Sequence, residues 1–179
     1  MRMRTQGFIP VLLLCLALLP PGWRAARAAE AMVPVEVQRV LLVNDQPAVV
    51  LANEREHAFL VVYIDAFMAQ AIQLGLLGLA IERPLTHDLI GILLNRLGAQ
   101  LSKVSITELR NDTYYALLSL RVNGSVQEID ARPSDALAIA VRTRTPIFVA
   151  RGLLSDRLFP EEGPGEAAPE GPAKPKQGA

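Results

Sequence analysis

The sequence predicts an α+β domain with an aliphatic core, and three observations support this fold class. Apolar residues alternate with polar ones in some segments and recur at helical spacing in others, so strands and helices are mixed along the chain. Asn123-Gly124 separates two strand-like segments and is the typical loop of a two-residue β-hairpin. Hydrophobic residues make up 51% of the chain but aromatic ones only 5%, so Leu, Ile, Val and Ala must fill the core.

The first 28 residues have the pattern of a signal peptide. A basic start at residues 1–4 precedes an apolar stretch of 12 residues from Phe8 to Leu19, and Ala26-Arg27-Ala28 offers a cleavage site. A membrane-spanning helix needs about 20 apolar residues, which is clearly more than this stretch provides. We therefore expect a periplasmic or secreted protein that meets the membrane only through its transient signal segment. The alternative is a protein anchored in the membrane by an uncleaved signal.

Cysteine usage and charge narrow the kinds of site that the mature chain can contain. Cys15 is the single cysteine and lies in the signal segment, so residues 29–179 can form no disulfide, thiolate nucleophile or zinc–cysteine site. The signal segment also contains four of the 18 basic residues and no acidic ones, which leaves 14 basic against 18 acidic residues, a net charge of −4. Nucleic acid is normally bound by a basic surface, so such a substrate would need a local basic patch or a bridging metal ion.

The folded domain is expected within residues 29–159. Residues 160–179 are rich in Pro, Gly, Ala, Glu and Lys without apolar periodicity, which is typical of a disordered tail. Val33–Val43 and Ala48–Leu51 have the pattern of two strands around a turn at residues 44–47, and Ala58–Ile64 has that of a third. Ala66–Leu79 is apolar nearly all round, which predicts a buried helix.

A second helix is predicted to begin near Thr86 as N-cap and to stop at Gly98, with Asp88 suited to its positive start. Its apolar residues form one stripe at helical spacing: Leu89, Ile90, Leu93, Leu94 and Leu97. Further along, the pattern predicts three strands, a third helix and a last strand. The three strands are Val104–Arg110, Thr113–Val122 and Ser125–Arg132, and the last strand is Pro146–Val149. The third helix runs from Pro133 through Val141, with Ser134 as its N-cap.

Two similar segments indicate an internal repeat. Ile64-Asp65-Ala66 followed by Ala71-Ile72 resembles Ile129-Asp130-Ala131 followed by Ala136-Leu137, 65 residues later. Both segments lie where a predicted strand leads into a predicted helix. They fit a duplicated strand–helix–strand–strand unit, with chance similarity as the alternative.

The predicted hairpins place several polar residues in one row. If residues 111–112 and 123–124 are both two-residue loops, Glu108, Tyr115 and Arg132 lie opposite one another on three successive strands, with Asp130 beside them. The carboxylates of Glu108 and Asp130 could hold Mg²⁺ or Mn²⁺, and Arg132 could bind a phosphate through its bidentate fork. The alternative is a solvated sheet face with ordinary cross-strand ion pairs.

Two residues at predicted helix starts, His87 and Asp135, are further candidates. His87 lies beside Asp88 in the first turn of the second helix and is either a general base or metal ligand, or a surface capping residue. Asp135 suits the start of the third helix whatever its role, and it is close in sequence to Asp130. The sequence contains no Gly-rich phosphate loop, nucleophile elbow or H-E-x-x-H motif, so these site types are excluded.

Four segments of the sequence resemble the bifunctional nuclease domain family, and the similarity extends over roughly residues 33–154. They are Glu82-Arg83-Pro84-Leu85-Thr86-His87-Asp88-Leu89, Leu97-Gly98-Ala99, Ile129-Asp130-Ala131-Arg132-Pro133-Ser134-Asp135-Ala136-Leu137-Ala138 and Pro146-Ile147-Phe148-Val149-Ala150. The resemblance implies a duplicated α+β fold whose mostly antiparallel sheet curls into a barrel-like core with packed helices. It also implies, for some relatives, nuclease activity on both DNA and RNA.

The resemblance carries the family's distinctive polar residues onto positions of this chain: Arg83, Thr86, His87, Asp88, Glu108, Asp130, Arg132, Ser134 and Asp135. The leading hypothesis is an exported nuclease. Its candidate catalytic residues are Asp130, Asp135, Glu108 and His87, its candidate substrate-binding residues are Arg132, Arg83, Ser134 and Tyr115, and its candidate metal ligands are Asp130 and Glu108.

The alternative is a non-catalytic binding or assembly module that keeps the fold without the chemistry. Relatives often have Phe-Glu-Ala where this chain has Phe67-Met68-Ala69, so one carboxylate is missing here. We also expect a homodimer if the fold leaves apolar helix surface uncovered.

Overall fold

The computed structural model describes residues 31–79 and 82–158. The predicted signal peptide at residues 1–28 and the predicted tail at residues 160–179 lie outside the described residues. Among those described, no helix is long and apolar enough to cross a membrane.

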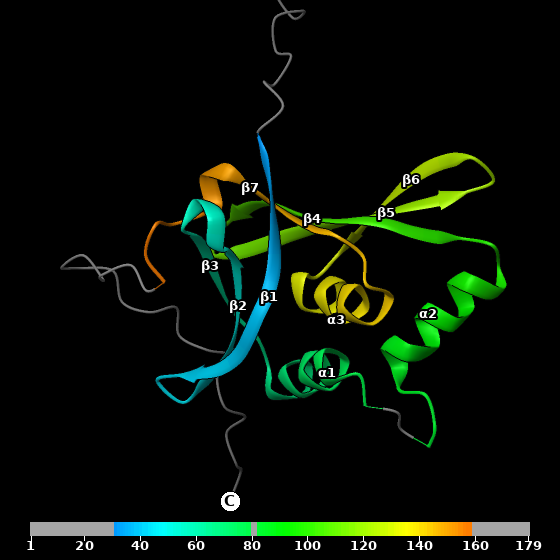
Figure 1. Ribbon diagram of the computed structural model, residues 1–179, viewed down its shortest axis with the longest axis horizontal. Helices are drawn as coiled ribbons and strands as arrows, with labels where there is room; N and C mark the ends of the chain where they lie inside the picture. Colours follow the sequence, from blue (N-terminus) through cyan, green and yellow to red (C-terminus); the bar gives the residue numbers. More distant parts are fainter. Residues whose placement is uncertain (1–30, 80–81, 159–179) are drawn as a thin grey trace, which may run out of the picture. The chain divides into compact units, whose positions relative to one another are not determined.

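One seven-stranded sheet forms the frame of the domain (Figure 1). Its order is β3-β2-β1-β7-β4-β5-β6, and every neighbouring pair is antiparallel except β4 and β7, which are parallel. The strands are β1 (Met32–Val43), β2 (Gln46–Asn53), β3 (Ala58–Tyr63), β4 (Gln100–Arg110), β5 (Thr113–Val122), β6 (Ser125–Ala131) and β7 (Ile147–Ala150). The α+β class and the mostly antiparallel sheet are therefore confirmed.

The expectation of a barrel-like core is wrong, because the sheet is open. Strands β3 and β6 stand at its two ends and do not pair with each other. The two halves of the sheet are joined only by β7, which contributes four residues beside the longer β1 and β4. Closure would require hydrogen bonds between the two end strands.

Three α-helices occur in the described residues: α1 (Ala66–Leu77), α2 (Thr86–Arg96) and α3 (Pro133–Thr143). Two single-turn 3₁₀ helices, η2 (Glu54–Glu56) and η3 (Arg151–Leu153), complete the elements. Figure 1 shows α1 and α3 side by side, with α2 at the edge of the domain. Helix α1 is shorter than predicted, because Gly78 takes a left-handed φ of 60° and ends it.

Two predicted N-caps are wrong by one or two residues. Leu85, not Thr86, is the N-cap of α2; its side chain makes no capping hydrogen bond, and the Asp88 carboxylate accepts the Leu85 N–H. Arg132, not Ser134, is the N-cap of α3. Pro133 takes the first helical position, where its fixed φ fits and its lack of an N–H has no cost.

The core is aliphatic, as the composition predicts. Its largest fully buried side chains come from β2, α1, β4, α3 and β7: Leu51, Ile72, Ile106, Leu137, Val49, Val50, Val104 and Val149. Helix α3 is buried along most of its length, from Pro133 to Ala140 except for Asp135. Its polar residues are therefore held in place by a rigid core.

Both predicted hairpins have the expected register. Leu117 faces Asp130 across β5 and β6, and Glu108 faces Tyr115 across β4 and β5. The loop residues Asn123 and Gly124 both have positive φ, as a type I′ turn requires, and so do the residues of the other loop, at positions 111–112. The pattern of alternation and the turn residues together were sufficient to predict this register.

Both of the similar segments lie where a strand leads into a helix, but Asp65 is the N-cap of α1 whereas Asp130 is still inside β6. Strands β1 to β3 form an antiparallel meander that leads into α1, and β4 to β6 form another that leads into α3. Each segment therefore spans the passage from the last strand of a meander into a helix. The duplication of a unit stays a prediction.

Candidate functional site

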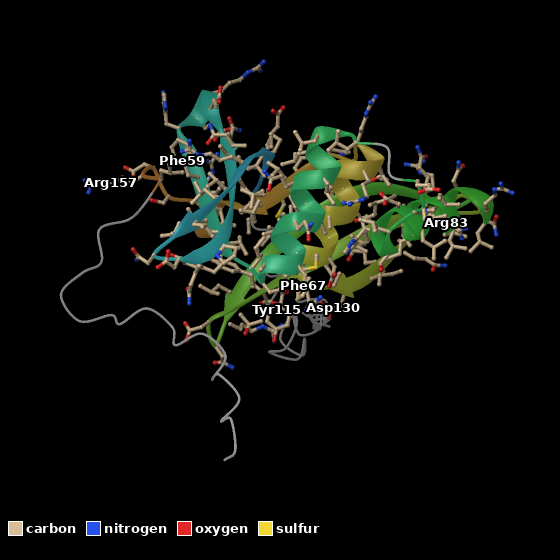
Figure 2. The ribbon with its side chains drawn as sticks, turned by 90° about the horizontal axis from the view of Figure 1, so that it is seen from below. Phe59, Phe67, Arg83, Tyr115, Asp130 and Arg157 are labelled. Atoms are coloured by element: carbon tan, nitrogen blue, oxygen red, sulfur yellow. The ribbon has the colours of Figure 1, made fainter. Side chains whose placement is uncertain are left out.

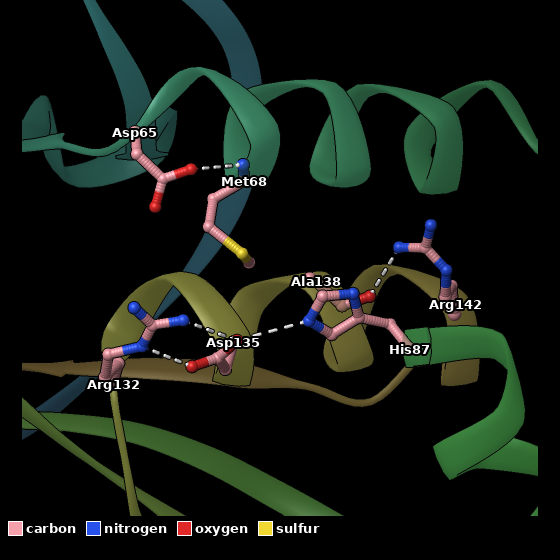
Figure 3. A network of polar contacts seen from close by, with 7 residues as sticks. All are labelled: Asp65, Met68, His87, Arg132, Asp135, Ala138 and Arg142. Atoms are coloured by element: carbon pink, nitrogen blue, oxygen red, sulfur yellow. Dashed lines mark hydrogen bonds and ion pairs between the residues drawn. The ribbon is translucent and has the colours of Figure 1, made fainter. Parts of the chain in front are cut away.

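The clearest polar cluster joins the first turn of α2 to the first turn of α3 (Figure 3). Arg132 donates to the Asp135 carboxylate through Nε, at 2.6 Å, and through Nη2, at 3.2 Å. His87 Nε2 lies 3.2 Å from Asp135 Oδ1. One carboxylate is thus shared between a bidentate guanidinium and an imidazole.

Local sequence explains how these three side chains meet. Asp135 is the third residue of α3 and Arg132 is its N-cap, so the pair is related by the i, i+3 spacing of neighbours on a helix. A carboxylate is also favoured in the first turn, where the helix dipole is positive. His87 is the only buried residue of α2, and it comes from a segment 48 positions earlier in the chain.

The charge state of Asp135 follows from these contacts. The hydrogen bond from Arg132 holds the pKa of the Asp135 carboxyl below its ordinary value; burial opposes this effect, and the hydrogen bond to His87 reinforces it. Asp135 is therefore an ionised acceptor at neutral pH. Because an ionised carboxylate can only accept, His87 must carry a proton on Nε2 when its ring is neutral, which leaves Nδ1 as the basic atom.

A second polar link lies one residue further along α2. Arg142 Nε donates to Asp88 Oδ1 at 2.5 Å, and Arg142 Nη1 donates to the Ala138 carbonyl at 2.8 Å. Burial raises the pKa of the Asp88 carboxyl, but the Leu85 N–H and Arg142 outweigh it and lower the pKa overall. Helix α2 is thus docked on α3 by two adjacent side chains, His87 and Asp88.

A cleft of about 670 Å³ lies beside this second link. Asp88, Arg142 and Arg144 line it on the side of α2 and α3, Glu36 on the side of β1, and apolar residues from the end of α1 complete it. The cleft therefore places charged groups of both signs next to the helix that carries His87.

The predicted row on the sheet is present only in part. Glu108 faces Tyr115 as expected, but their neighbour is Arg110, whose Nη2 lies 2.9 Å from Glu108 Oε1 and whose guanidinium lies 4.2 Å from the centre of the Tyr115 ring. Strand β6 ends at Ala131, and the next residue turns into the N-cap of α3. Arg132 therefore leaves the ladder and binds Asp135 instead.

The predicted site residues are thus divided between two places. Tyr115 points to the face of the sheet opposite that of its neighbour Ala116, which is buried in the core beneath α3. Glu108 and Asp130 share the face of Tyr115, whereas Asp135 and the buried Ser134 belong to α3. Arg83 is exposed in the turn before α2, and Figure 2 shows it well away from Tyr115 and Asp130.

The two predicted metal ligands do not converge on a metal site. Glu108 lies in β4 and Asp130 in β6, with β5 between them, and Glu108 is paired with Arg110. Within residues 31–79 and 82–158, no group of three or more His, Cys, Asp or Glu side chains could hold a metal ion. Metal binding by Glu108 and Asp130 therefore stays a prediction.

Comparison with known proteins decides the family. Residues 49–162 match the family model described as the bifunctional nuclease domain. The chain belongs to the bifunctional nuclease domain family.

Two kinds of relative illustrate the range of this family. An uncharacterised protein of Mycobacterium tuberculosis strain H37Rv is 38% identical over 131 residues, which is 72% of this chain and 78% of that protein. Bifunctional nuclease 1 of Oryza sativa subsp. japonica is 36% identical over 80 residues, which is 43% of this chain and 24% of that protein. Bifunctional nuclease 1 of Arabidopsis thaliana is 31% identical over 111 residues, which is 60% of this chain and 34% of that protein. This chain thus spans only a quarter to a third of the plant nucleases.

Two arginines of this bifunctional nuclease domain, Arg142 and Arg110, take part in these contacts but were not predicted from the sequence. Arg142 follows Asp135 by seven residues, or two helical turns, so both side chains lie on the same face of α3. The predicted helix from Pro133 would therefore have indicated that both face α2. Arg110 lies two residues after Glu108 on the same strand, which puts both on one face if the strand is regular. In both cases periodicity was the available signal.

Met68 is the residue at which the family resemblance implies a glutamate. It is buried in the core, and its N–H donates to the N-cap carboxylate of Asp65 at 2.8 Å. The first turn of α1 therefore contributes an apolar side chain to the space near α3 (Figure 3).

Proposed function

We propose that this protein is an exported nuclease that hydrolyses phosphodiester bonds of DNA, RNA or both, with the Arg132–Asp135–His87 network as its site. The observation that carries the proposal is the Asp135 carboxylate, which is shared between His87 and Arg132. Membership of the bifunctional nuclease domain family and the names of the plant relatives support it.

The proposal gives each group of this network a role. Asp135 holds the His87 ring through Nε2, so that Nδ1 can accept a proton from a water that attacks the phosphorus, and the negative carboxylate then stabilises the imidazolium. As the bond from phosphorus to the leaving oxygen breaks, the imidazolium can return this proton to that oxygen. Arg132 uses two of its five N–H donors on Asp135, and its side chain is 68% exposed. The remaining donors can bind a phosphate, which the net negative charge of residues 29–179 would repel.

A test must distinguish this network from the row on the sheet. Purified full-length protein is assayed on single- and double-stranded DNA and on RNA, with Asp135→Asn and Asp130→Asn as a matched pair. We expect Asp135→Asn to lower kcat/KM by at least about 100-fold, because a neutral amide cannot stabilise the imidazolium, while Asp130→Asn keeps most of the activity. Circular dichroism confirms that both variants are folded.

The opposite pattern, in which only Asp130→Asn loses nuclease activity, would place the site on the sheet face of Glu108 and Tyr115. Arg132→Lys provides a second readout, since lysine keeps the charge but loses the bidentate fork. We expect it to raise KM more than it lowers kcat. Cleavage that survives in every variant would indicate a contaminating nuclease.

Metal assistance by Mg²⁺ or Mn²⁺ and export through residues 1–28 are further parts of the proposal. The assay is therefore run with Mg²⁺, with Mn²⁺ and with EDTA, and full activity in EDTA would remove the metal from the proposal. For export, the full-length chain is expressed in a Gram-negative host and the mass of the periplasmic product is measured. A product that begins after Ala28 is expected, whereas an intact chain in the membrane fraction would indicate an uncleaved anchor.

The second candidate is a binding module that keeps the family's fold without its chemistry. The observation in its favour is Met68, which places an apolar side chain in the core where relatives often have a carboxylate. Tight binding of DNA or RNA by the folded protein, without cleavage in Mg²⁺, Mn²⁺ or EDTA, would favour this reading over the nuclease.

A further inference from the structure

Helix α2 carries an unusual apolar surface on its outer side. Five aliphatic side chains between its N-cap and its C-cap are 38% to 76% exposed, and they are called the α2 ridge here: Leu85, Leu89, Ile92, Leu93 and Leu97. We propose that the α2 ridge is the interface of a homodimer, in which a second copy of this chain packs its own α2 antiparallel on the first.

The α2 ridge points away from the domain to which α2 belongs. Leu85, Leu89, Leu93 and Leu97 are spaced four residues apart and so form one line along the helix. The opposite face is occupied, because His87 pairs with Asp135 and a Cβ at Gly91 would lie 3.6 Å from Thr143. Figure 1 shows α3 on the inner side of α2 and none of the labelled elements on its outer side.

The exposed area is large enough to need a partner. Single exposed leucines are normal on a protein surface, but a contiguous line of them marks an interaction site. The five side chains of the α2 ridge offer on the order of 500 Å² per copy, so two copies would bury about 1,000 Å², the lower end for a specific interface.

The charges around the α2 ridge favour a second copy in an antiparallel arrangement. Arg96 lies on the outer face, seven residues after Leu89, whereas the exposed Glu82 lies just before the start of the helix. Antiparallel packing brings Arg96 of each copy toward Glu82 of the other and opposes the two helix dipoles. A parallel pair would bring the two Arg96 side chains together. The surface is therefore complementary to itself, as a two-fold interface requires.

The oligomeric state of the full-length protein tests the inference. Light scattering coupled to size-exclusion chromatography is applied to the wild type, to Leu89→Glu and to Leu42→Glu as the matched control. Leu42 is an exposed leucine of β1, outside α2. We expect a dimer for the wild type and Leu42→Glu, and a dimer Kd raised about 100-fold or more for Leu89→Glu, because the interface would bury an unpaired carboxylate.

Leu89 is already half exposed in one copy, so its replacement should leave the fold intact, and circular dichroism verifies this. Arg96→Glu tests the orientation, since it should weaken the dimer and Glu82→Arg in the same chain should restore it. A monomeric wild type, or a Leu89→Glu variant that dimerises as the wild type does, would overturn the proposal. So would a monomer that binds anionic lipid vesicles through the α2 ridge, because the occupant would then be a membrane surface.

Discussion

At the scale of single residues, Asp135 determines how the candidate site is organised. Its carboxylate accepts hydrogen bonds from Arg132 and lies within hydrogen-bonding distance of His87, and these contacts outweigh its burial and lower its pKa. A carboxylate whose pKa is lowered by folding stabilises the folded protein above the pKa of the unfolded state. That contribution disappears as the pH falls through the folded-state pKa.

Asp135→Asn should therefore change the acid stability of the protein. We expect the variant to be less stable by about 1 kcal/mol from neutral pH down to about pH 4, close to the ordinary pKa of 3.8. Below that value the difference should shrink, because the wild-type carboxyl becomes protonated. Urea unfolding followed by circular dichroism at successive pH values measures the two free energies, and a constant difference down to about pH 2 would contradict the role of the ionised carboxylate.

At the scale of elements, the contact between α1 and α3 depends on a missing side chain. Gly75 lies inside α1, and a Cβ at this position would meet Val141 Cγ2 at 2.5 Å and Arg142 Nη1 at 2.8 Å. The two helices can approach this closely only because residue 75 is glycine. The same approach positions Arg142, which holds Asp88 and with it the start of α2.

Gly75→Ala and Gly91→Ala should change stability in opposite directions. Alanine at 75 would overlap Val141 and should lower the free energy of unfolding by about 1–3 kcal/mol. Alanine at 91 meets only Thr143, at an ordinary 3.6 Å, so its better helix propensity should raise stability by about 0.5–1 kcal/mol. Urea denaturation of both variants compares them directly, and a stabilised Gly75→Ala would show that the helices can separate without cost.

At the scale of the whole domain, the short strand β7 connects two halves. It pairs antiparallel with β1 and parallel with β4, so both meanders depend on it. The segment after it returns to the first half, where Phe59 and Ser155 exchange two backbone hydrogen bonds and Arg151 pairs with Glu56. The two halves should therefore unfold together.

Val149→Ala tests this connection. Val149 is fully buried in β7, so its truncation should lower the free energy of unfolding by about 2 kcal/mol. Val126→Ala, in the end strand β6, removes an exposed side chain and should change stability by less than about 0.5 kcal/mol. Circular dichroism should show a single transition in both variants, whereas two separate transitions would mean that the halves unfold independently.

Most elements of the fold could be predicted because their signals are local. The loop at Asn123-Gly124 needs positive φ at both positions, so it specifies a hairpin and its register without help from the rest of the chain. Periodicity likewise identified all three helices. The errors fall at the ends of elements: β4 begins at Gln100 rather than Val104, and α2 has Leu85 rather than Thr86 as its N-cap.

The sequence by itself determined the α+β class, the aliphatic core, the hairpin register and the membership of a nuclease family, since all of these follow from patterns along the chain. Only the tertiary structure decided that the sheet stays open and that the candidate residues divide between two places. Strand β6 ends at Ala131 and Arg132 becomes the N-cap of α3, so Arg132 does not join the row, and packing of α2 on α3 brings His87 to Asp135 across 48 positions. Contacts of that separation depend on packing in three dimensions, which no local pattern specifies.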